Sequence, residues 1–427
     1  ITWVPRRFIN MVELTADEVL VSYLPLSHIA AQLLDIHFPM LIGCCVHFAR
    51  PDALRGSLVQ TLQEARPTIF FGVPRVWEKI MEKMKSRGAS VKGLKRKLAT
   101  WAKKKGLAHS MSLQYATDAR APGCYGCAHK LVLSKVHRAL GLDRMRMAFT
   151  AAAPIARETL DYFASLSIHV YEIFGQSECT GPATANYPGT WKIGSCGVAV
   201  PGTTIKIAEG NGEIVYTGRH IFMGYMKMPE QTAEAIDEEG YLHSGDVGEL
   251  DRHGFLRITG RIKELIITAG GENIPPVLIE HEMKKEMPAL SNVVVIGDRR
   301  KFLTMLVSLK TKVDLETQEP LDELDAEAAQ TSAEIGSDAT TMSAAAQCPK
   351  WRQYITAGMQ AANKRATSNA QRVQYWTMLP KDLSLPDGDL TPTLKLKRSV
   401  VQNKYAELIE DMYAGKATST AGKGPKG

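Results

Sequence analysis

Short apolar runs alternate with helical segments over the first two thirds of the chain. The expected strands are rich in β-branched and aromatic residues, and the expected helices place apolar residues three or four positions apart. We expect strands at Val19–Leu24, Thr68–Val73, Met145–Thr150 and His169–Phe174, and helices at Arg75–Lys85 and Ile155–Leu166. Strand, helix and strand in succession predict a parallel α/β layer.

The pattern changes after this layer. The turn Gly210, Asn211, Gly212 lies between two short apolar runs and predicts a hairpin, and a second turn at His253 and Gly254 predicts another. A smaller unit follows Arg261. In it we expect a helix at Pro276–Lys285, strands at Asn292–Ile296 and Leu303–Leu309, and an amphipathic helix at Ser399–Tyr413.

A length of 427 residues favours two domains. We place a large domain at 1–260 and a small α+β domain at 261–414, with the boundary near Lys263. A polar segment rich in Ala, Thr and Glu, 314–347, is expected to be an exposed helical insertion. The last residues, 415–427, hold small residues and lysines and are expected to be disordered.

Charge is concentrated in one block, although the net charge of the chain is only +7. Between Lys83 and Lys105 lie ten Lys or Arg residues and no Asp or Glu. Such a block is either a solvated helical face or a surface for an anionic membrane or a nucleic acid. No aromatic or groove-reading motif accompanies it, so we expect no nucleic-acid partner.

The number and spacing of the cysteines indicate the redox state of the cellular compartment. Seven cysteines without regular spacing fit a reducing compartment better than a disulfide scaffold. Cys124 and Cys127 lie near His129, but no second pair completes a zinc site, so we expect no metal there. The apolar stretch around 33–48 is interrupted by Asp35 and His37 and is too short to span a bilayer.

Three segments carry candidate chemistry. The run Tyr171–Glu178 ends a strand with a Gly and then a Ser and a Glu, at the strand end where open α/β sheets bind ligands. The small residues Ala151–Pro154 end the preceding strand in the same way. A second group joins Tyr241–Asp246 to Gly260–Pro276, and a third, Leu390–Arg398, carries a lysine on a loop before the last helix.

In this order the motifs resemble the adenylate-forming superfamily, and within it the bubblegum group of long-chain fatty acyl-CoA synthetases. The resemblance extends from Ile1 to about Tyr413 and implies the adenylate-forming α/β fold. It rests on the segments LPLSH (24–28), GVPRVWEKI (72–80), GRHIFMGY (218–225), EEGYLHSGD (238–246), TGRIKELIITAGGENIPP (259–276) and TPTLKLKR (391–398). It implies activation of a long-chain fatty acid by ATP through an acyl-AMP, followed by transfer to coenzyme A.

The resemblance also implies roles for the residues that end the two central strands. Glu178 would hold Mg²⁺, an ion that prefers oxygen ligands. Ser177 would bind a phosphate oxygen. Phe174 would stack on adenine, with Ala152 and Ala153 beside it.

The resemblance implies further roles for residues of the second and third segments. Asp246 would accept bonds from both ribose hydroxyls, and Arg261 would donate to ribose or phosphate. Lys395 would stabilise charge that develops in the adenylation transition state. Lys263 would be the hinge about which the small domain turns between half-reactions. Gly270 and Gly271 would line the approach of the thiol.

The chain departs from the wider superfamily at several positions. Phe174 stands where a Tyr is usual, Ser177 where a Thr is usual, and Leu394 where a Gly commonly precedes the catalytic lysine. The phosphate-binding loop of the family is not found, and Ile1–Trp3 resemble the segment that follows it. We therefore expect this loop to lie upstream of Ile1, the 427-residue chain alone to be inactive, and its large domain to expose apolar faces.

Alternatives remain at this stage. The chain could serve a different carboxylic acid, or be a catalytically inactive product that binds nucleotide weakly. We expect a cytoplasmic protein associated peripherally with the endoplasmic reticulum or other membranes.

Overall fold

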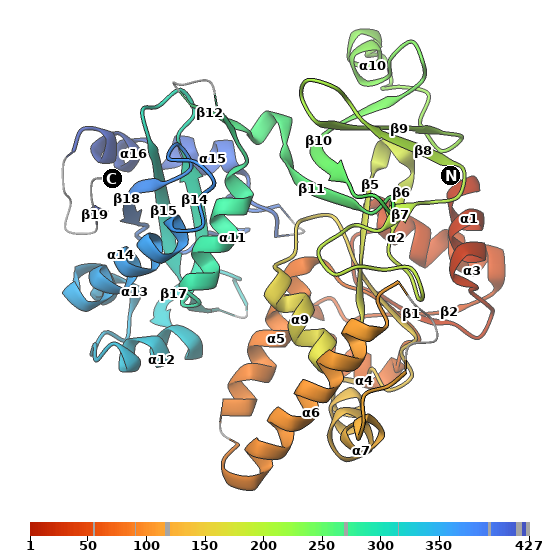
Figure 1. The fold of residues 1–427 in the computed structure, drawn as a ribbon, viewed down its shortest axis with the longest axis horizontal. Helices are drawn as coiled ribbons and strands as arrows, with labels where there is room; N and C mark the ends of the chain where they lie inside the picture. Colours follow the sequence, from red (N-terminus) through yellow and green to blue (C-terminus); the bar gives the residue numbers. More distant parts are fainter. Residues whose placement is uncertain are drawn as a thin grey trace. The chain divides into compact units, whose positions relative to one another are not determined.

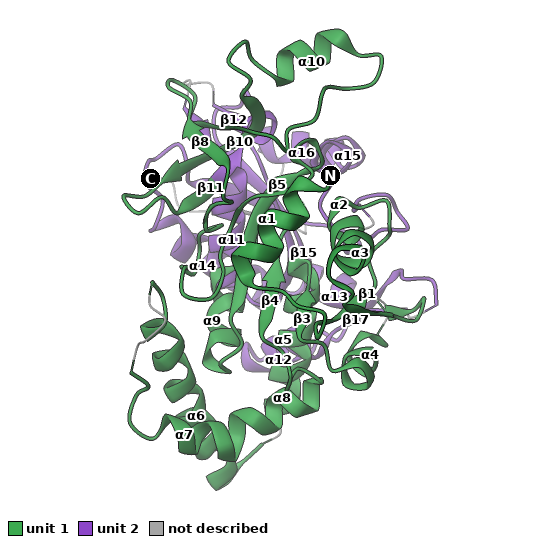
Figure 2. Cartoon of the chain, turned by 90° about the vertical axis from the view of Figure 1, so that its right-hand side faces the viewer, with its two compact units in different colours: residues 1–258 green, residues 259–427 purple. Residues whose placement is uncertain are grey.

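The computed structural model describes residues 1–53, 56–89, 91–115, 120–268, 272–314, 316–391, 394–415 and 421–423. The chain forms two compact units, Ile1–Ile258 and Thr259–Gly427 (Figure 2). The observed division lies just before Arg261, where the sequence analysis begins the small domain. Each unit has its own buried apolar cluster, and each is described by itself below.

A five-stranded sheet organises the first unit, in the order β3-β4-β5-β6-β7 (Figure 1). Its strands are β3 (Ile69–Phe71), β4 (Met147–Thr150), β5 (Val170–Gln176), β6 (Gly181–Ala185) and β7 (Val198–Ala199). β3, β4 and β5 run parallel, and β6 pairs antiparallel with β5. The predicted parallel α/β layer is therefore confirmed.

Helices α5 (Pro74–Ala89), α6 (Gly93–Ser112) and α9 (Arg157–Ser165) belong to the same layer, and α9 contacts both α5 and α6. Smaller elements complete this part of the unit. They are α1 (Trp3–Val12), β1 (Val19–Ser22), α2 (Ile29–Ala31), η1 (Gln32–His37), α3 (Phe38–Ile42), β2 (Cys45–Phe48), α4 (Leu58–Ala65), α7 (Tyr125–Ala128), η3 (His129–Leu133) and α8 (Ser134–Leu140).

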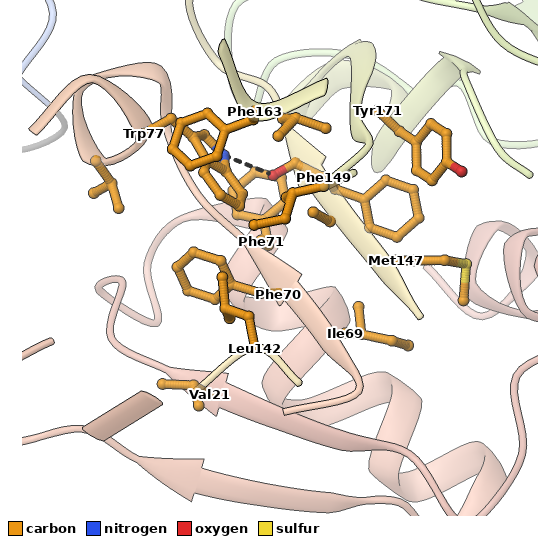
Figure 3. Packing of buried hydrophobic residues seen from close by; sticks show 14 of the residues in the cluster. Val21, Ile69, Phe70, Phe71, Trp77, Leu142, Met147, Phe149, Phe163 and Tyr171 are labelled. Carbon is orange, nitrogen blue, oxygen red and sulfur yellow. Dashed lines mark hydrogen bonds between the residues drawn. The ribbon is translucent and has the colours of Figure 1, made fainter. Parts of the chain in front are cut away.

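Trp77 lies at the centre of the large core (Figure 3). The rings of Phe70 and Phe163 pack edge-on against it, with centroids 5.2 and 4.9 Å away. Its indole nitrogen donates to the carbonyl oxygen of Phe149 on β4 at 3.3 Å. A Cβ at Gly72 would lie 2.7 Å from that nitrogen, so only glycine leaves room for the ring. The segment GVPRVWEKI thus joins β3 to α5 through the core.

A second sheet in this unit has the order β11-β10-β9-β8. Its strands are β8 (Thr203–Ile207), β9 (Glu213–Gly218), β10 (Leu242–Leu250) and β11 (Leu256–Arg261), and α10 (Pro229–Ala235) precedes β10. The predicted hairpin at Gly210–Gly212 is confirmed, because β8 and β9 pair antiparallel on either side of it.

The second unit is built on the sheet β14-β15-β18-β19. β14 (Leu290–Ile296) and β15 (Leu303–Leu309) pair antiparallel, β15 and β18 (Val373–Met378) pair parallel, and every residue of β15 is buried. The remaining elements are η5 (Ile262–Glu264), β12 (Ile266–Ile267), β13 (Asn273–Ile274), α11 (Pro276–Glu286), α14 (Pro349–Asn363), α15 (Arg398–Lys404) and α16 (Ala406–Tyr413). The single helix predicted over 399–413 is therefore two helices.

The segment 314–347, expected to be an exposed helical insertion, contains helices, but part of it is buried. The hairpin β16 (Thr311–Val313) and β17 (Pro320–Leu324) leads into α12 (Ala326–Glu334) and α13 (Met342–Gln347). Asp325 caps α12 by accepting from the amide of Ala328 at 2.8 Å. Ala328 and Met342 are almost fully buried in the core of the unit. A high content of small residues indicated exposure, whereas here those residues allow close packing.

The expectation of a disordered tail at 415–427 is also wrong for part of that segment. Ala421–Lys423 form β19, which pairs antiparallel with β18. Residues 416–420 and 424–427 lie outside the described residues.

Several large apolar side chains reach the surface of the first unit. Met40 on α3 and Phe48 on β2 are 78% and 72% exposed. Met223 and Met226, between β9 and α10, are 100% and 86% exposed. Among the described residues, no helix combines the length and the apolar character needed to cross a bilayer.

The buried imidazole of His169 should make stability fall in acid. Burial lowers the pKa of His169 to about 4, and Nε2 lies 3.0 Å from the Ser110 hydroxyl. The unfolded chain therefore takes up a proton near pH 6.5 while the folded chain does not. Stability present above that pH should decline by about 1.4 kcal/mol per pH unit as the pH falls from about 6.5 towards 4.

Urea unfolding of the chain and of His169→Gln, each measured at several pH values, tests this expectation. The variant should lose stability less steeply in acid than the wild-type chain. Parallel pH profiles for the two proteins would contradict the assignment.

Candidate functional site

The carboxyl ends of β4 and β5 lie at one edge of the first sheet. The two strands are parallel and adjacent, with Thr150 paired with Glu172. The segment after β4 contains Ala152, which is exposed and has φ of +76°, and the half-buried Ala153. The structure therefore brings the predicted adenine-side alanines to the same sheet edge as the end of β5, where open α/β sheets bind ligands.

The pairing of β5 with β6 depends on Gly175. A Cβ at this position would lie 1.7 Å from the carbonyl oxygen of Gly181 on β6, so no side chain fits. Phe174 is 5% exposed, and its ring lies edge-on to Tyr216 with the centroids 6.0 Å apart. Because this buried ring has no hydroxyl group, it needs no hydrogen-bond partner. Its stacking on adenine stays a prediction.

Ser177 and Glu178 lie in the short 3-10 helix η4 (Ser177–Cys179) that follows β5. Ser177 is exposed and Glu178 is half-buried. The hydroxyl of Tyr225 donates to Oε1 of Glu178 at 2.9 Å, and the amide of Phe222 donates to the Glu178 carbonyl oxygen at 2.8 Å. The segment between β9 and α10 thus holds Glu178 by both its backbone and its carboxylate.

Tyr225 supports this arrangement electrostatically. Burial and the hydrogen bond to the Glu178 carboxylate raise the pKa of Tyr225 to about 12, so its hydroxyl keeps its proton at neutral pH. The amide of Tyr225 in turn donates to the Thr232 hydroxyl at 2.9 Å.

Asp246 on β10 is joined to the end of β5 by Gln176. Nε2 of Gln176 donates to the carbonyl oxygen of Ser244 at 2.7 Å and lies 3.3 Å from Oδ2 of Asp246. Asp246 is 6% exposed. Gln176, two residues before Glu178 in the chain, therefore joins the end of β5 to the predicted ribose-side carboxylate of Asp246.

A second buried carboxyl group lies nearby on β5. Burial raises the pKa of Glu172 to about 8, so this side chain carries a proton at neutral pH. Its Oε2 accepts a hydrogen bond from the amide of Gly194 at 2.9 Å. This contact fastens the loop before β7 to the central strand.

Lys395 lies in the second unit, in a tight turn. Leu390 and Leu396 form an antiparallel bridge. The amide of Thr391 donates to the Lys395 carbonyl oxygen at 2.8 Å, and the amide of Lys395 donates to the Thr391 hydroxyl at 3.0 Å. Backbone and side-chain hydrogen bonds thus hold Lys395 to Thr391.

Two ion pairs stabilise the segments on either side of Lys395. Arg398, the first residue of α15, makes a bidentate pair with Glu280 of α11 at 2.6 and 2.9 Å. Lys404 lies 3.0 Å from both carboxylate oxygens of Asp389, which is fully buried. Bidentate, charge-assisted contacts fix geometry as well as distance.

Leu394, directly before the lysine, has φ of +61°. This left-handed conformation costs an ordinary residue about 1–2 kcal/mol relative to a right-handed one, and only glycine adopts it freely. The conformation gives a physical reason for the glycine that is common at this position in the resembling family.

Four predicted site residues remain, of which the structure describes two. Arg261 ends β11, and Lys263 is exposed in η5. Gly270 and Gly271 lie outside the described residues. Within those residues, no group of three or more His, Cys, Asp or Glu side chains is arranged to hold a metal ion.

Family comparisons account for both units. Residues 3–226 match the AMP-binding enzyme family, and residues 263–417 match the C-terminal domain of AMP-binding enzymes. The chain belongs to the AMP-binding enzyme family. The resemblance inferred from its motifs is thereby confirmed.

Curated relatives within this family carry the name long-chain-fatty-acid--CoA ligase. The chain is 51% identical to ACSBG2 of Xenopus laevis over 95% of its own length and 55% of the relative's. It is 50% identical to ACSBG2 of Gallus gallus over 97% and 55%, and 46% identical to ACSBG1 of Homo sapiens over 93% and 55%. The chain thus spans about half the length of these relatives.

Solved structures of AMP-binding enzymes share the fold. The adenylation domain of a carboxylate reductase from Mycobacterium chelonae aligns with a TM-score of 0.64 at 21% identity, covering 93% of this chain and 54% of that one. The A domain of a carboxylic acid reductase from Segniliparus rugosus, in complex with AMP and a co-purified carboxylic acid, aligns with a TM-score of 0.63 at 19% identity, covering 94% and 55%. The predicted adenylate-forming fold is confirmed.

Several residues of the candidate site were missed by the sequence analysis. Gln176 and Tyr225 lie inside recognised motifs, yet a motif does not say which of its side chains touch one another. Tyr216 lies in the second strand of the predicted hairpin, and nothing in the sequence indicated a role for its side chain. Thr391 also lay within a recognised segment, and only its contacts with Lys395 show its part in shaping the turn.

The backbone conformation of Leu394 predicts an unusual order of stability among substitutions. Leu394→Gly should lie within about 1 kcal/mol of the wild-type chain, because relief of strain offsets the greater freedom of the unfolded chain. Leu394→Val should be less stable by about 1 kcal/mol or more, since a β-branched residue is poorly accommodated at positive φ.

Urea unfolding measures both variants, with Leu390→Val as a control at a leucine of the same hairpin. A Leu394→Val protein as stable as the wild-type chain would show that the left-handed conformation is not kept in solution.

Proposed function

We propose that this AMP-binding enzyme activates a long-chain fatty acid with ATP, forms an acyl-AMP with release of pyrophosphate, and transfers the acyl group to coenzyme A. The observation that carries the proposal is the geometry at the end of β5, where Gln176 contacts the Asp246 carboxylate and Glu178, two residues later, is held by Tyr225. The names of the curated relatives support the choice of acid.

Nucleotide binding would use the edge formed by β4 and β5. Ala152 and Ala153 offer a surface without bulky side chains for a flat base, and Asp246 offers a carboxylate to the ribose hydroxyls. Ser177 is exposed at the turn and would donate to a phosphate oxygen. Arg261 would add donors of fixed geometry to ribose or phosphate.

Magnesium fits the chemistry of Glu178. This half-buried carboxylate is a hard oxygen ligand, and Tyr225 holds one of its oxygens in place. Since Mg²⁺ is often held by one or two carboxylates together with substrate phosphates, Glu178 can serve without a protein cage. Bound there, the ion would neutralise charge on the phosphates during transfer.

Lys395 would stabilise the negative charge that develops when the fatty-acid carboxylate attacks the α-phosphate. Its backbone hydrogen bonds and the nearby ion pair of Arg398 with Glu280 support this role, because preorganised donors need no rearrangement during the reaction. Lys263, exposed in η5, would be the hinge for the second half-reaction, and Gly270 and Gly271 would line the approach of coenzyme A.

Two alternatives give different results in the same assays. A ligase for another carboxylic acid would release pyrophosphate with that acid and not with palmitate. A catalytically inactive nucleotide binder would release none with any acid. The long-chain fatty acid is favoured because relatives at about half sequence identity bear that name.

The proposal is tested by palmitate-dependent pyrophosphate release and acyl-CoA formation. Both are measured for the 427-residue chain alone and for a fusion in which these residues replace the matched part of the Xenopus laevis relative. We expect the fusion to release pyrophosphate and to form acyl-CoA. A fusion that folds and binds ATP but releases no pyrophosphate with any fatty acid would contradict the proposal.

Two lysine variants of the fusion should separate the half-reactions. Lys395→Ala should slow acyl-AMP formation by about 10²- to 10³-fold, because one transition-state donor is lost. It should leave thioester formation from supplied acyl-AMP nearly unchanged. Lys263→Pro, which fixes φ at the hinge, should show the opposite pattern. Equal losses in both half-reactions for either variant would count against its assigned role.

We further propose that the enzyme docks on membranes through the first turns of α6. The exposed residues there are Leu94, Lys95, Arg96, Lys97 and Leu98, with Leu94 82% exposed. Trp101 and Leu107, further along α6, pack against the core and do not belong to this surface. The exposed leucines would enter the interface while the cations face lipid phosphates, each worth about 1 kcal/mol near an anionic surface.

Co-sedimentation with vesicles of phosphatidylserine and phosphatidylcholine tests this docking. Changing Lys95, Arg96 and Lys97 to Glu should weaken binding at least tenfold, since three attractions of about 1 kcal/mol each become repulsions. The same charge change at Lys301, Lys312 and Lys364, which are exposed in the second unit, is the matched control. Equal binding by the two triple variants would refute the assigned surface.

The location remains a proposal: the cytoplasmic face of the endoplasmic reticulum or of other membranes. It rests on the odd number and irregular spacing of the cysteines, which suit a reducing compartment. It also rests on the basic surface described above. Fractionation of cells that express the protein, with and without the three glutamates, measures it directly.

A further inference from the structure

The side-chain amide of Gln176 is held at both of its ends. Nε2 donates to the Ser244 carbonyl oxygen at 2.7 Å and lies 3.3 Å from Oδ2 of Asp246. On the other side, the hydroxyl of Tyr216 donates to Oε1 at 2.9 Å. All three partners lie on β9 or β10, so the last residue of β5 connects one sheet of the unit with the other.

The direction of this amide matters because its two ends have opposite hydrogen-bonding character. Nε2 offers only donors and Oε1 only acceptors. If the amide turned over, Oε1 would lie against the Asp246 carboxylate and the Ser244 carbonyl oxygen, which are both acceptors. The two acceptors at Ser244 and Asp246 therefore select the amide orientation, because a tyrosine hydroxyl can either donate or accept. The Tyr216 hydroxyl supports the selected orientation by donating to Oε1.

Packing keeps Tyr216 in its place. The residue is fully buried, with the ring of Phe174 edge-on at 6.0 Å and the ring of His220 stacked at 6.4 Å. Burial lowers the pKa of His220 to about 4, so the stacked imidazole is neutral at physiological pH. The hydroxyl therefore approaches Gln176 from a ring with little freedom to move.

We propose that Gln176 and Tyr216 are positioning residues that orient the Asp246 carboxylate toward the two hydroxyls of a ribose. This inference rests on the proposed function, in which Asp246 binds the sugar of the nucleotide. It adds a specific consequence. The orientation of one carboxylate oxygen decides how strongly the protein distinguishes a ribonucleotide from its deoxy counterparts.

The amide engages one of the two carboxylate oxygens of Asp246, Oδ2. A carboxylate can accept several hydrogen bonds at once. The amide of Asp246 donates to the Ser244 hydroxyl at 3.0 Å, which fixes the backbone on which the carboxylate is carried. A carboxylate restrained at both backbone and side chain loses little freedom when two hydroxyls bind, and such preorganisation favours affinity.

Isothermal titration of the 427-residue chain with AMP, 2′-deoxy-AMP and 3′-deoxy-AMP tests the inference. A hydrogen bond to a charged group contributes about 1.5–3 kcal/mol, so the wild-type chain should prefer AMP by roughly tenfold or more. In Gln176→Leu this preference should fall to about threefold or less. Tyr216→Phe, which removes a single hydroxyl, should give an intermediate preference.

Asp246→Asn serves as the reference for lost ribose recognition, and thermal unfolding of each variant checks that it folds. A merely structural role for Gln176 would lower the affinity for all three nucleotides equally, and that result would overturn the inference. If Gln176→Leu does not fold, an unchanged preference in Tyr216→Phe would overturn it instead. A wild-type chain that binds none of the three nucleotides would contradict the proposed function itself.

Discussion

The parallel pairing of β4 with β5 is the constraint on which the candidate site depends. Because the strands run in the same direction, their carboxyl ends meet at one edge, and the alanines after β4 lie near the turn after β5. The core beneath them keeps this pairing in place, since Trp77 of α5 bonds to the backbone of β4 and fills the space above Gly72. Removing either contact would disturb the register before it disturbed any side chain of the site.

Much of this arrangement could be predicted from the sequence. Hydrophobic runs located β3, β4 and β5, and the motif at Tyr171–Glu178 located the end of the central strand. Small residues were harder to interpret. Composition indicated an exposed insertion at 314–347, although Ala328 and Ala345 are buried against the second core. An alanine looks the same in a sequence whether it faces solvent or allows two elements to approach closely, so only tertiary structure distinguishes the two cases.

The side-chain network of the site was less predictable than its position. Gln176 and Tyr225 touch partners that lie far along the chain, on β10 and in η4. Such contacts depend on which sheet edge a strand occupies, and local spacing contains no such information. The conformation of Leu394 is a similar case. A departure from the family's usual glycine was visible in the sequence, but its meaning required the measured φ of +61°.

The close approach at Gly175 restricts how this motif can change during evolution. A single methyl group at this position would overlap the Gly181 carbonyl oxygen, so even alanine is excluded. Substitutions are less restricted at the neighbouring positions. Phe174 packs in a buried cluster through its aromatic ring and needs no hydroxyl, and Ser177 is exposed to solvent. Substitutions in this motif are therefore expected beside the glycine and not at the glycine itself. This chain departs from its wider superfamily at two such positions, Phe174 and Ser177.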